Sequence, residues 1–212
     1  MGQTGKEWVG QSVERVEDLS LLSGRGRYID DLPLRPDTLH AAVLRSPHAH
    51  AKIRAIDTAA AAAASGVAAV VTGRDVTALS ASPVVGAKAP IECWPIAVDR
   101  VRYVGQPVAV VVAADRYLAE DALELIEVDY EPPLPVVDPL DALDPKLPPL
   151  HEGLGSNIAS DRSFRYGDPE RAFAQASRRI SVSVGYPRNS CTPIETYGVI
   201  AEYDAVKILT RR

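Results

Sequence analysis

The stretch most suggestive of chemistry is Arg100–Pro132, "RVRYVGQPVAVVVAADRYLAEDALELIEVDYEP". A glycine precedes an apolar run, a helical pattern and a second short apolar run, which outlines a nucleotide-binding βαβ unit. A phosphate loop, however, needs several glycines between a strand and a helix, so that backbone N–H groups cradle the phosphate. Here Gly105 precedes the expected strand, and Asp115 at the start of the helix would repel phosphate. We therefore interpret Gly105 as a turn or bulge that leads into a core strand.

Two further groups of residues could contact a ligand. The segment Ser23–Asp31, "SGRGRYIDD", interleaves two glycines with arginines and could fix an anion, although a flexible turn has the same composition. His48 and His50 form His-x-His, and on a strand both rings would point to one face. A structural metal site needs about four ligands, and no third or fourth ligand is identifiable. Surface or interface histidines are the alternative.

The remaining candidate groups are isolated. Cys191 has no evident histidine neighbour, so a buried or partly buried thiol is the alternative to a nucleophile. Cys93 and Cys191 lie too far apart in sequence to begin a metal cluster. Glu195 is a single carboxylate with no partner, which is weak support for acid–base catalysis. The residues alone therefore assign no catalytic, cofactor-binding or metal-binding position.

Composition is typical of a globular protein. The chain has 212 residues, is 46% hydrophobic and 24% charged, and has a net charge of −5. Acids and bases alternate without a basic stripe, so the footprint of a nucleic-acid-binding protein is absent. No apolar run approaches the ~20 residues that a membrane helix needs, and the first residues show no apolar signal region. We expect a soluble cytoplasmic protein with reduced thiols.

The elements that must position these residues form two strand–helix–strand units. The first has two short strands in His40–Asp57, broken at Ser46-Pro47, then an alanine helix, then a strand. We expect Thr58 to cap this helix, Gly66 to end it, Val67–Val71 to form the strand, and Thr72-Gly73 to turn.

A loop is expected from about Val76 to Pro95, because it carries three prolines and no strong periodicity. The second unit follows the loop, with a strand at Val108–Ala113, a helix capped by Asp115 to about Glu124, and a strand from about Ile126 to Tyr130. The apolar helical face consists of Leu118, Ala122 and Leu125, flanked by Ala119 and Ile126.

The segment Glu131–Asn157 is rich in proline and glycine, which predicts an extended connector and a domain boundary. Beyond it, Asp168 is a good N-cap with Pro169 at the first helical position. Alternation over Arg179–Tyr186 and the segment Ile194–Asp204 each predict a strand. The fold class is α+β.

Several of these stretches, in this order, resemble one family. They are "GRGRYIDDL", "LHAAVLRSPHAHAKIRAID", "GVAAVVTGRDV", the Val101–Pro132 stretch with "EPPLPVV", "GDPERAFAQASRRISVSV" and "NSCTPIETYGVIAEYDA". Together they are similar to the N-terminal part of the large, molybdenum-cofactor subunit of the xanthine dehydrogenase, aldehyde oxidase and carbon monoxide dehydrogenase family. The resemblance runs from about Val9 to about Ala205.

The resemblance implies an N-terminal arm at 1–19, an α/β-hammerhead domain at 20–132, a linker at 133–157, and the incomplete start of a molybdopterin-binding α/β domain at 158–212. Family members hydroxylate a carbon of an aldehyde or heterocycle, or oxidise CO, with water as the oxygen source. Electrons pass from molybdenum to 2Fe–2S clusters and usually to FAD, which partner small and medium subunits carry. Dimers of such heterotrimers are common.

Family large subunits continue for several hundred residues, and their glycine-rich "GGxFGxK"-like segment, cofactor-contacting glutamine and late catalytic glutamate have no matching position here. Glu195 matches a recurring family glutamate, for which we expect a structural or supporting role.

The first hypothesis is a truncated large subunit, inactive alone and with no cofactor bound, arising from truncation, a shifted reading frame or a deliberate fragment. The second is a stand-alone, non-catalytic module that docks onto the iron–sulfur and flavin subunits. The third is an unrelated nucleotide-binding protein.

Overall fold

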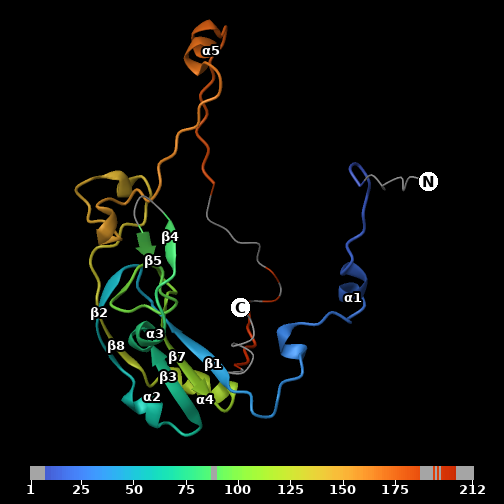
Figure 1. The fold of residues 1–212 in the computed structure, drawn as a ribbon, viewed down its shortest axis with the longest axis vertical. Coiled ribbons are helices and arrows are strands. Elements are labelled where there is room, and N and C mark those ends of the chain that lie inside the picture. Colours follow the sequence, from blue (N-terminus) through green and yellow to red (C-terminus); the bar gives the residue numbers. More distant parts are fainter. Residues whose placement is uncertain (1–7, 87–89, 187–192, 194, 196, 204–212) are drawn as a thin grey trace. The chain divides into compact units, whose positions relative to one another are not determined.

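The computed structural model describes residues 8–86, 90–186, 193, 195 and 197–203 (Figure 1). The chain divides into two units, one made of Met1–Pro36 with Ile180–Arg212 and the other of Asp37–Arg179. Almost all regular structure lies in the second unit. Helix and strand content is mixed, which confirms the α+β fold class. None of the described helices is long and apolar enough to cross a membrane.

The first sheet of the Asp37–Arg179 unit has three antiparallel strands in the order β1-β7-β3. They are β1 (His40–Arg45), β7 (Pro107–Ala113) and β3 (Val67–Thr72). The central strand reads PVAVVVA, a continuous β-branched and small apolar run, as expected for a strand covered on both faces. Val110 pairs with Val43 on one side and with Val71 on the other.

The second sheet is also antiparallel, in the order β6-β2-β8. Its strands are β6 (Arg100–Val101), β2 (Ala51–Asp57) and β8 (Glu127–Glu131). Ile53 pairs with Tyr130, and the register shifts between Ile53 and Ala55. A separate hairpin joins β4 (Val84–Gly86) to β5 (Pro90–Glu92).

Both predicted strand–helix–strand units are present, and each crosses from one sheet to the other. Helix α2 (Ala59–Ala63) connects β2 to β3, and α4 (Arg116–Leu123) connects β7 to β8. The two strands of each unit therefore belong to different sheets, whereas a nucleotide-binding βαβ unit places two parallel strands in one sheet. Figure 1 shows α4 beside β1 and β7. The Asp115 carboxylate caps α4 by accepting from the Leu118 amide at 2.9 Å.

The core consists of two clusters that share β7. Its alternate residues Ala109, Val111 and Ala113 are fully buried against α4 and α2, as period-two geometry requires. Val108, on the other face, belongs to the second cluster. That cluster also contains Ala51, Ala97 and Val101. Alanines of α2, α4 and β7 line much of this helix–sheet contact.

Several sequence expectations within this unit are wrong. The Thr72-Gly73 pair does not turn but starts α3 (Gly73–Leu79), because Thr72 and Asp75 form a capping box. The predicted loop from Val76 to Pro95 contains the rest of α3 and the β4–β5 hairpin. Leu125 is 44% exposed, because α4 ends at Leu123 and releases it from the buried face.

The proline-rich connector is also more structured than expected. The connector contains the 3₁₀ turns η2 (Asp141–Leu143) and η3 (Glu152–Leu154).

The ends of helix α2 differ from the sequence expectation. Thr58 is at the N-cap of α2 but makes no side-chain cap bond; the Asp57 carboxylate accepts from the Ala59 amide instead, at 2.9 Å. Gly66 does not end α2, because the C-cap of that helix is Ala64; Gly66 lies in the turn before β3, with a φ of +80°.

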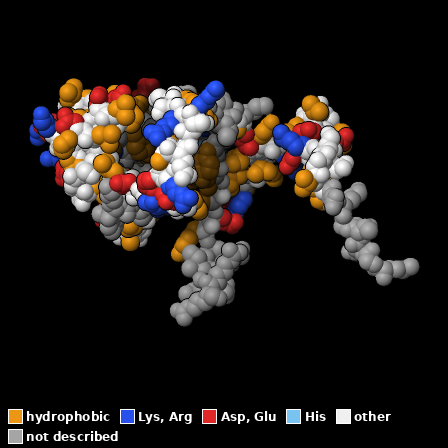
Figure 2. Space-filling model, turned by 90° about the horizontal axis from the view of Figure 1, so that it is seen from above, with side chains coloured by type: hydrophobic (Ala, Val, Ile, Leu, Met, Phe, Trp, Pro, Cys, Tyr) orange, Lys and Arg blue, Asp and Glu red, His pale blue; other side chains and the backbone are white. Residues whose placement is uncertain are grey.

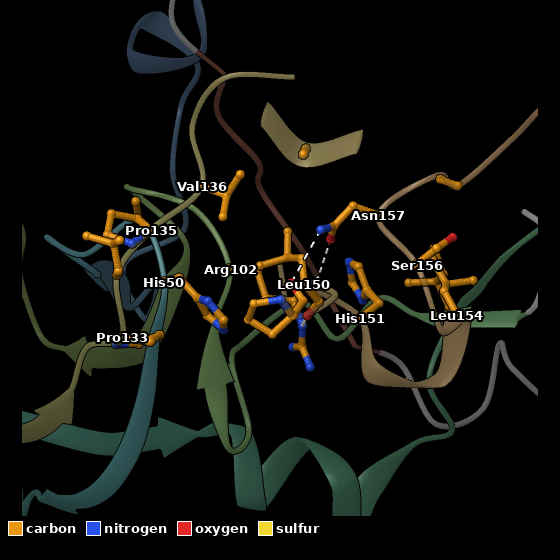
Figure 3. A pocket seen from close by; sticks show the side chains of 16 residues that line it. His50, Arg102, Pro133, Pro135, Val136, Leu150, His151, Leu154, Ser156 and Asn157 are labelled. Atoms are coloured by element: carbon orange, nitrogen blue, oxygen red, sulfur yellow. Dashed lines mark hydrogen bonds between the residues drawn. The ribbon is translucent and has the colours of Figure 1, made fainter. Parts of the chain in front are cut away.

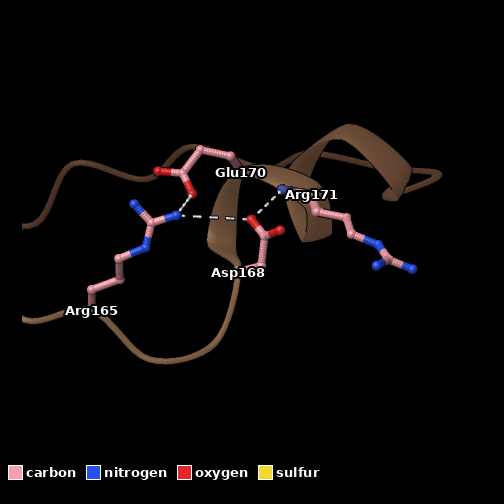
Figure 4. Close-up of polar contacts among 4 residues, drawn as sticks. All are labelled: Arg165, Asp168, Glu170 and Arg171. Atoms are coloured by element: carbon pink, nitrogen blue, oxygen red, sulfur yellow. Dashed lines mark hydrogen bonds and ion pairs between the residues drawn. The ribbon is translucent and has the colours of Figure 1, made fainter.

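Helix α5 (Pro169–Gln175) forms as predicted, with Asp168 accepting from the Arg171 amide at 3.1 Å. Arg165 contacts the carboxylates of Asp168 and Glu170 at the start of this helix (Figure 4). Acidic groups at a helix N-terminus are favourable, because the exposed amides there carry partial positive charge. Arg165 joins these acids into a local network around the cap.

The strand predicted at Arg179–Tyr186 is wrong, because this segment pairs with no described residue. The described residues 197–203 of the last predicted strand form no strand either. In the other unit, α1 (Asp18–Leu22) and η1 (Ile29–Asp31) are short. The surface in Figure 2 shows basic and acidic side chains interspersed, with many hydrophobic side chains exposed between them.

Candidate functional site

A cleft of about 310 Å³ lies between the second sheet and the proline-rich connector, within the Asp37–Arg179 unit. We call it the connector cleft. The sheet side contributes His50, just before β2, and Arg102, just after β6 (Figure 3). The connector supplies the apolar wall and His151. The lining residues are Ala49, His50, Ile91, Arg102, Pro133, Leu134, Pro135, Val136, Ala142, Pro148, Leu150, His151, Leu154, Ser156, Asn157 and Ala159.

Hydrogen bonds hold the connector in shape at this cleft, and one of them joins it to the sheet side. The Asn157 side chain accepts from the Leu150 amide at 2.7 Å and donates to the Pro148 carbonyl at 3.3 Å (Figure 3). Arg102 donates from Nε to the Leu150 carbonyl at 3.4 Å. The backbone amide of Arg102 donates to the buried Gln106 side chain at 2.6 Å, and this bond holds the Arg102 backbone in place.

Both cleft histidines are electrostatically biased toward the neutral form. Burial, and then the charges of Arg100 and Arg102, lower the pKa of His50, while Glu152 opposes them. Burial and Arg102 likewise lower the pKa of His151. Desolvation disfavours the charged imidazolium, and a nearby cation adds to that effect. At neutral pH these rings are therefore neutral hydrogen-bonding groups.

Arg100 links the sheet to the connector beside the cleft. Its Nη2 lies 3.0 Å from Oε1 of Glu152 in η3, and its Nη1 lies 3.4 Å from Nε2 of His50. Arg100 is more buried than its exposed partner Glu152. The pair therefore neutralises one of the two arginines near the cleft.

The His48/His50 pair does not point to one strand face as expected, because both residues precede β2. The His48 and Tyr130 rings pack in a T-shaped arrangement, with centroids 4.9 Å apart, whereas His50 lines the cleft. Burial raises the pKa of Tyr130. Among the residues that the structure describes, no three His, Cys, Asp or Glu side chains are placed to hold a metal.

Gly105 lies in a turn, as predicted, with a φ of +88° that favours glycine. Its amide donates to the Ser46 carbonyl at 2.8 Å, and its own carbonyl accepts from Arg45 at 2.9 Å. The next amide, of Gln106, donates to the Tyr103 carbonyl. These bonds tie the turn before β7 to the end of β1, and they leave the Gly105 and Gln106 amides occupied within the chain.

The Ser23–Asp31 segment does contact an anion, and this anion is the chain's own Glu195. The Glu195 carboxylate accepts from the Ile29 amide at 2.6 Å, at the start of η1. Just beyond this segment, Arg35 forms an ion pair with Glu202 at 2.6 Å. Sequence reasoning identified both partners of the first contact separately but had no signal for their pairing.

The two cysteines add little to the candidate site. Cys93 is exposed and free. Cys191 lies outside the described residues.

The resemblance implies a molybdopterin cofactor. Its phosphate would need unused backbone amides or a set of cations. The amides of Gly105 and Gln106 are bonded within the chain, and the Asp115 carboxylate already occupies the start of α4. These groups therefore do not form a phosphate site.

A family model described as "Aldehyde oxidase and xanthine dehydrogenase, a/b hammerhead domain" matches residues 23–133. Its limits enclose both sheets and both strand–helix–strand crossings. The carbon monoxide dehydrogenase large chain of Afipia carboxidovorans is 37% identical over 94% of this chain and 26% of its own length. The nicotinate dehydrogenase large molybdopterin subunit of Eubacterium barkeri is 28% identical over 97% of this chain and 47% of its own length.

Among solved structures, quinoline 2-oxidoreductase from Pseudomonas putida 86 is similar, with a TM-score of 0.64 and 44% identity. The match covers 71% of this chain and 20% of that chain. The sequence given thus spans about a quarter of the length of the carbon monoxide dehydrogenase large chain. The fold similarity agrees with the family model.

Proposed function

Because this chain belongs to the aldehyde oxidase and xanthine dehydrogenase family and carries its α/β-hammerhead domain, we propose that it is the scaffold part of a molybdenum hydroxylase large subunit. The activity of the whole enzyme would be hydroxylation of an aldehyde or heterocycle carbon, or oxidation of CO, with water as the oxygen source. We place the hammerhead domain at 20–132, after an arm at 1–19. The linker at 133–157 would lead to the start of a molybdopterin-binding domain at 158–212.

The observation that carries this proposal is the pair of crossings between two antiparallel sheets. Both helices of these crossings pack on alanine and valine residues of the core, and β7 belongs to both core clusters. Such an arrangement builds a platform whose two described core clusters consist of apolar residues. Its contribution to the enzyme is therefore to position neighbouring parts of the subunit.

The proposed partners follow from the same membership. Iron–sulfur and FAD subunits would take electrons from the molybdenum centre, and two such heterotrimers would pair in the cytoplasm. Molybdenum, when bound in the whole enzyme, would supply the redox chemistry. The residues of this chain would fold the platform and position the connector, and would not hold the cofactor themselves.

Measurement of bound molybdenum tests the proposal that the residues of this chain do not hold the cofactor. The purified chain should contain no more molybdenum by mass spectrometry than a mock purification from the same host. It should also show no oxidation of CO, aldehydes or heterocycles with an artificial electron acceptor. Near-stoichiometric molybdenum that survives gel filtration would contradict the proposal, because the described residues would then belong to a cofactor site.

A second candidate function, a non-catalytic module that docks onto the iron–sulfur and flavin subunits, is favoured by one observation. Ile180, Val182, Val184 and Tyr186 all have exposed side chains on an extended segment. Exposed apolar groups in sequence suit an interface. Pull-down of the two subunits by this chain at micromolar concentration would support the module, and the absence of association would remove it.

A further inference from the structure

The connector cleft has the size and lining of a small-molecule site. Its volume of about 310 Å³ falls at the lower end of the roughly 300–1,000 Å³ range of ligand pockets. Most lining residues are apolar, including Ile91, Pro133, Val136 and Leu154. A few polar groups placed in apolar walls are the usual means of orienting a bound molecule.

Arg102 gives this cleft a positive charge that the lining does not balance. No aspartate or glutamate is among the lining residues. The neighbouring Arg100 is paired with Glu152, whereas Arg102 forms no ion pair with any residue in the described part of the chain. Its single side-chain hydrogen bond is the long one to the Leu150 carbonyl. Arg102 is partly buried, and an anionic partner would stabilise a cation in this position.

We propose that the connector cleft binds a small-molecule carboxylate with a ring-sized apolar body. The carboxylate contacts the Arg102 guanidinium, whose planar fork matches two oxygens. The apolar body packs against the proline and leucine wall of the connector. This site goes beyond the platform role proposed above and does not depend on it.

The two histidines suit this ligand as neutral neighbours. Because their pKa values are lowered, His50 and His151 add no further charge at neutral pH and can each donate or accept one hydrogen bond. A single cation between two neutral rings favours a monoanion over a multiply charged anion such as phosphate. The cleft therefore discriminates both by charge and by apolar shape.

Calorimetric titration of the full chain with benzoate tests the proposal, with benzamide and inorganic phosphate as comparison probes. We expect benzoate to bind with a Kd below about 10 mM and benzamide to bind at least about tenfold more weakly, because it lacks the charge. Phosphate should also bind at least about tenfold more weakly, because it has no apolar body. This comparison uses only the unmodified protein, so it holds even if a cleft variant folds poorly.

Variants then locate the site. Arg102→Gln should weaken benzoate binding about tenfold or more, and Arg102→Lys should lie between it and the unmodified chain. Arg116→Gln is the matched control, since Arg116 is exposed on α4 and pairs with Glu120. Equal affinity for benzoate and benzamide, phosphate binding as tightly as benzoate, no benzoate binding at all, or an unchanged affinity in Arg102→Gln would each overturn the proposal.

Discussion

Gly73→Ala should destabilise the Asp37–Arg179 unit strongly, because the site has no room for a Cβ atom. A Cβ built on Gly73 would lie 2.1 Å from the Ala97 carbonyl oxygen and 2.8 Å from Cα of Val98. Side-chain Cβ atoms essentially never approach within 3.0 Å, so the first gap must widen by about 0.9 Å. Both obstacles are backbone atoms, which cannot rotate away.

The segment that would have to move is held from two sides. The Ala97 amide donates to the Pro107 carbonyl at the start of β7, and the Asp99 carbonyl accepts from the Ile53 amide of β2, both at 2.8 Å. Overpacking costs about 1–3 kcal/mol, and a weakened hydrogen bond adds about 1 kcal/mol. We expect a loss near 3 kcal/mol and a fall in Tm of about 6–12 °C for a chain of this size.

Thermal and urea unfolding followed by far-ultraviolet circular dichroism would measure the loss. Gly153→Ala is the control, because its Cβ would meet nothing within 4 Å and its φ is not positive. We expect that control to stay within about 0.5 kcal/mol of the parent. If Gly73→Ala matched Gly153→Ala in stability, the close approach of α3 to the Ala97–Val98 backbone would be refuted.

Four further outcomes are expected. Asp115→Ala should cost about 1 kcal/mol in urea unfolding through loss of the α4 cap, whereas Asp121→Ala, an exposed change within the same helix, should cost much less; equal losses would contradict the cap. Because the folded pKa values of His50 and His151 lie below the unfolded value of 6.5, the unfolded chain binds more protons, and stability should fall as pH drops below about 6.5. Arg100 and Arg102 lower the His50 pKa and Glu152 raises it, so Arg100→Gln should raise that pKa in an NMR titration, and an unchanged value would contradict the contact. Amides of Ile180–Gly185 should exchange with deuterium far faster than those of β7, and comparable protection would show that this segment pairs after all.

The elements with the clearest local signals were predicted within one or two residues. The apolar run of β7, the Asp115 cap of α4 and the Asp168-Pro169 start of α5 each depend on nearby residues. Helix α3 had a usable signal that was missed. Thr72 and Asp75 have the spacing of a capping box, and hydrogen bonds from Thr72 hold the pKa of Asp75 below its ordinary value.

Other features depend on contacts that no local pattern encodes. The alternation over Arg179–Tyr186 is a genuine strand pattern, but a strand also needs a partner whose backbone accepts and donates along its edge. The Glu195–Ile29 contact joins residues more than 160 positions apart, and the connector cleft uses a segment with no periodicity at all. Sequence reasoning therefore predicted the platform far better than the cleft.

One part of the cleft did have a sequence signal, in Arg100-Val101-Arg102. Val101 is fully buried in the second core cluster, so its two neighbours, in nearly extended backbone, project to the opposite side. That side faces the connector, where Arg100 engages Glu152 and Arg102 lines the cleft. A single buried valine thus positions both cations. A larger or polar residue at position 101 would disturb both the Arg100–Glu152 ion pair and the placement of the Arg102 guanidinium in the cleft. The scaffold and the proposed carboxylate site are linked through this two-residue strand.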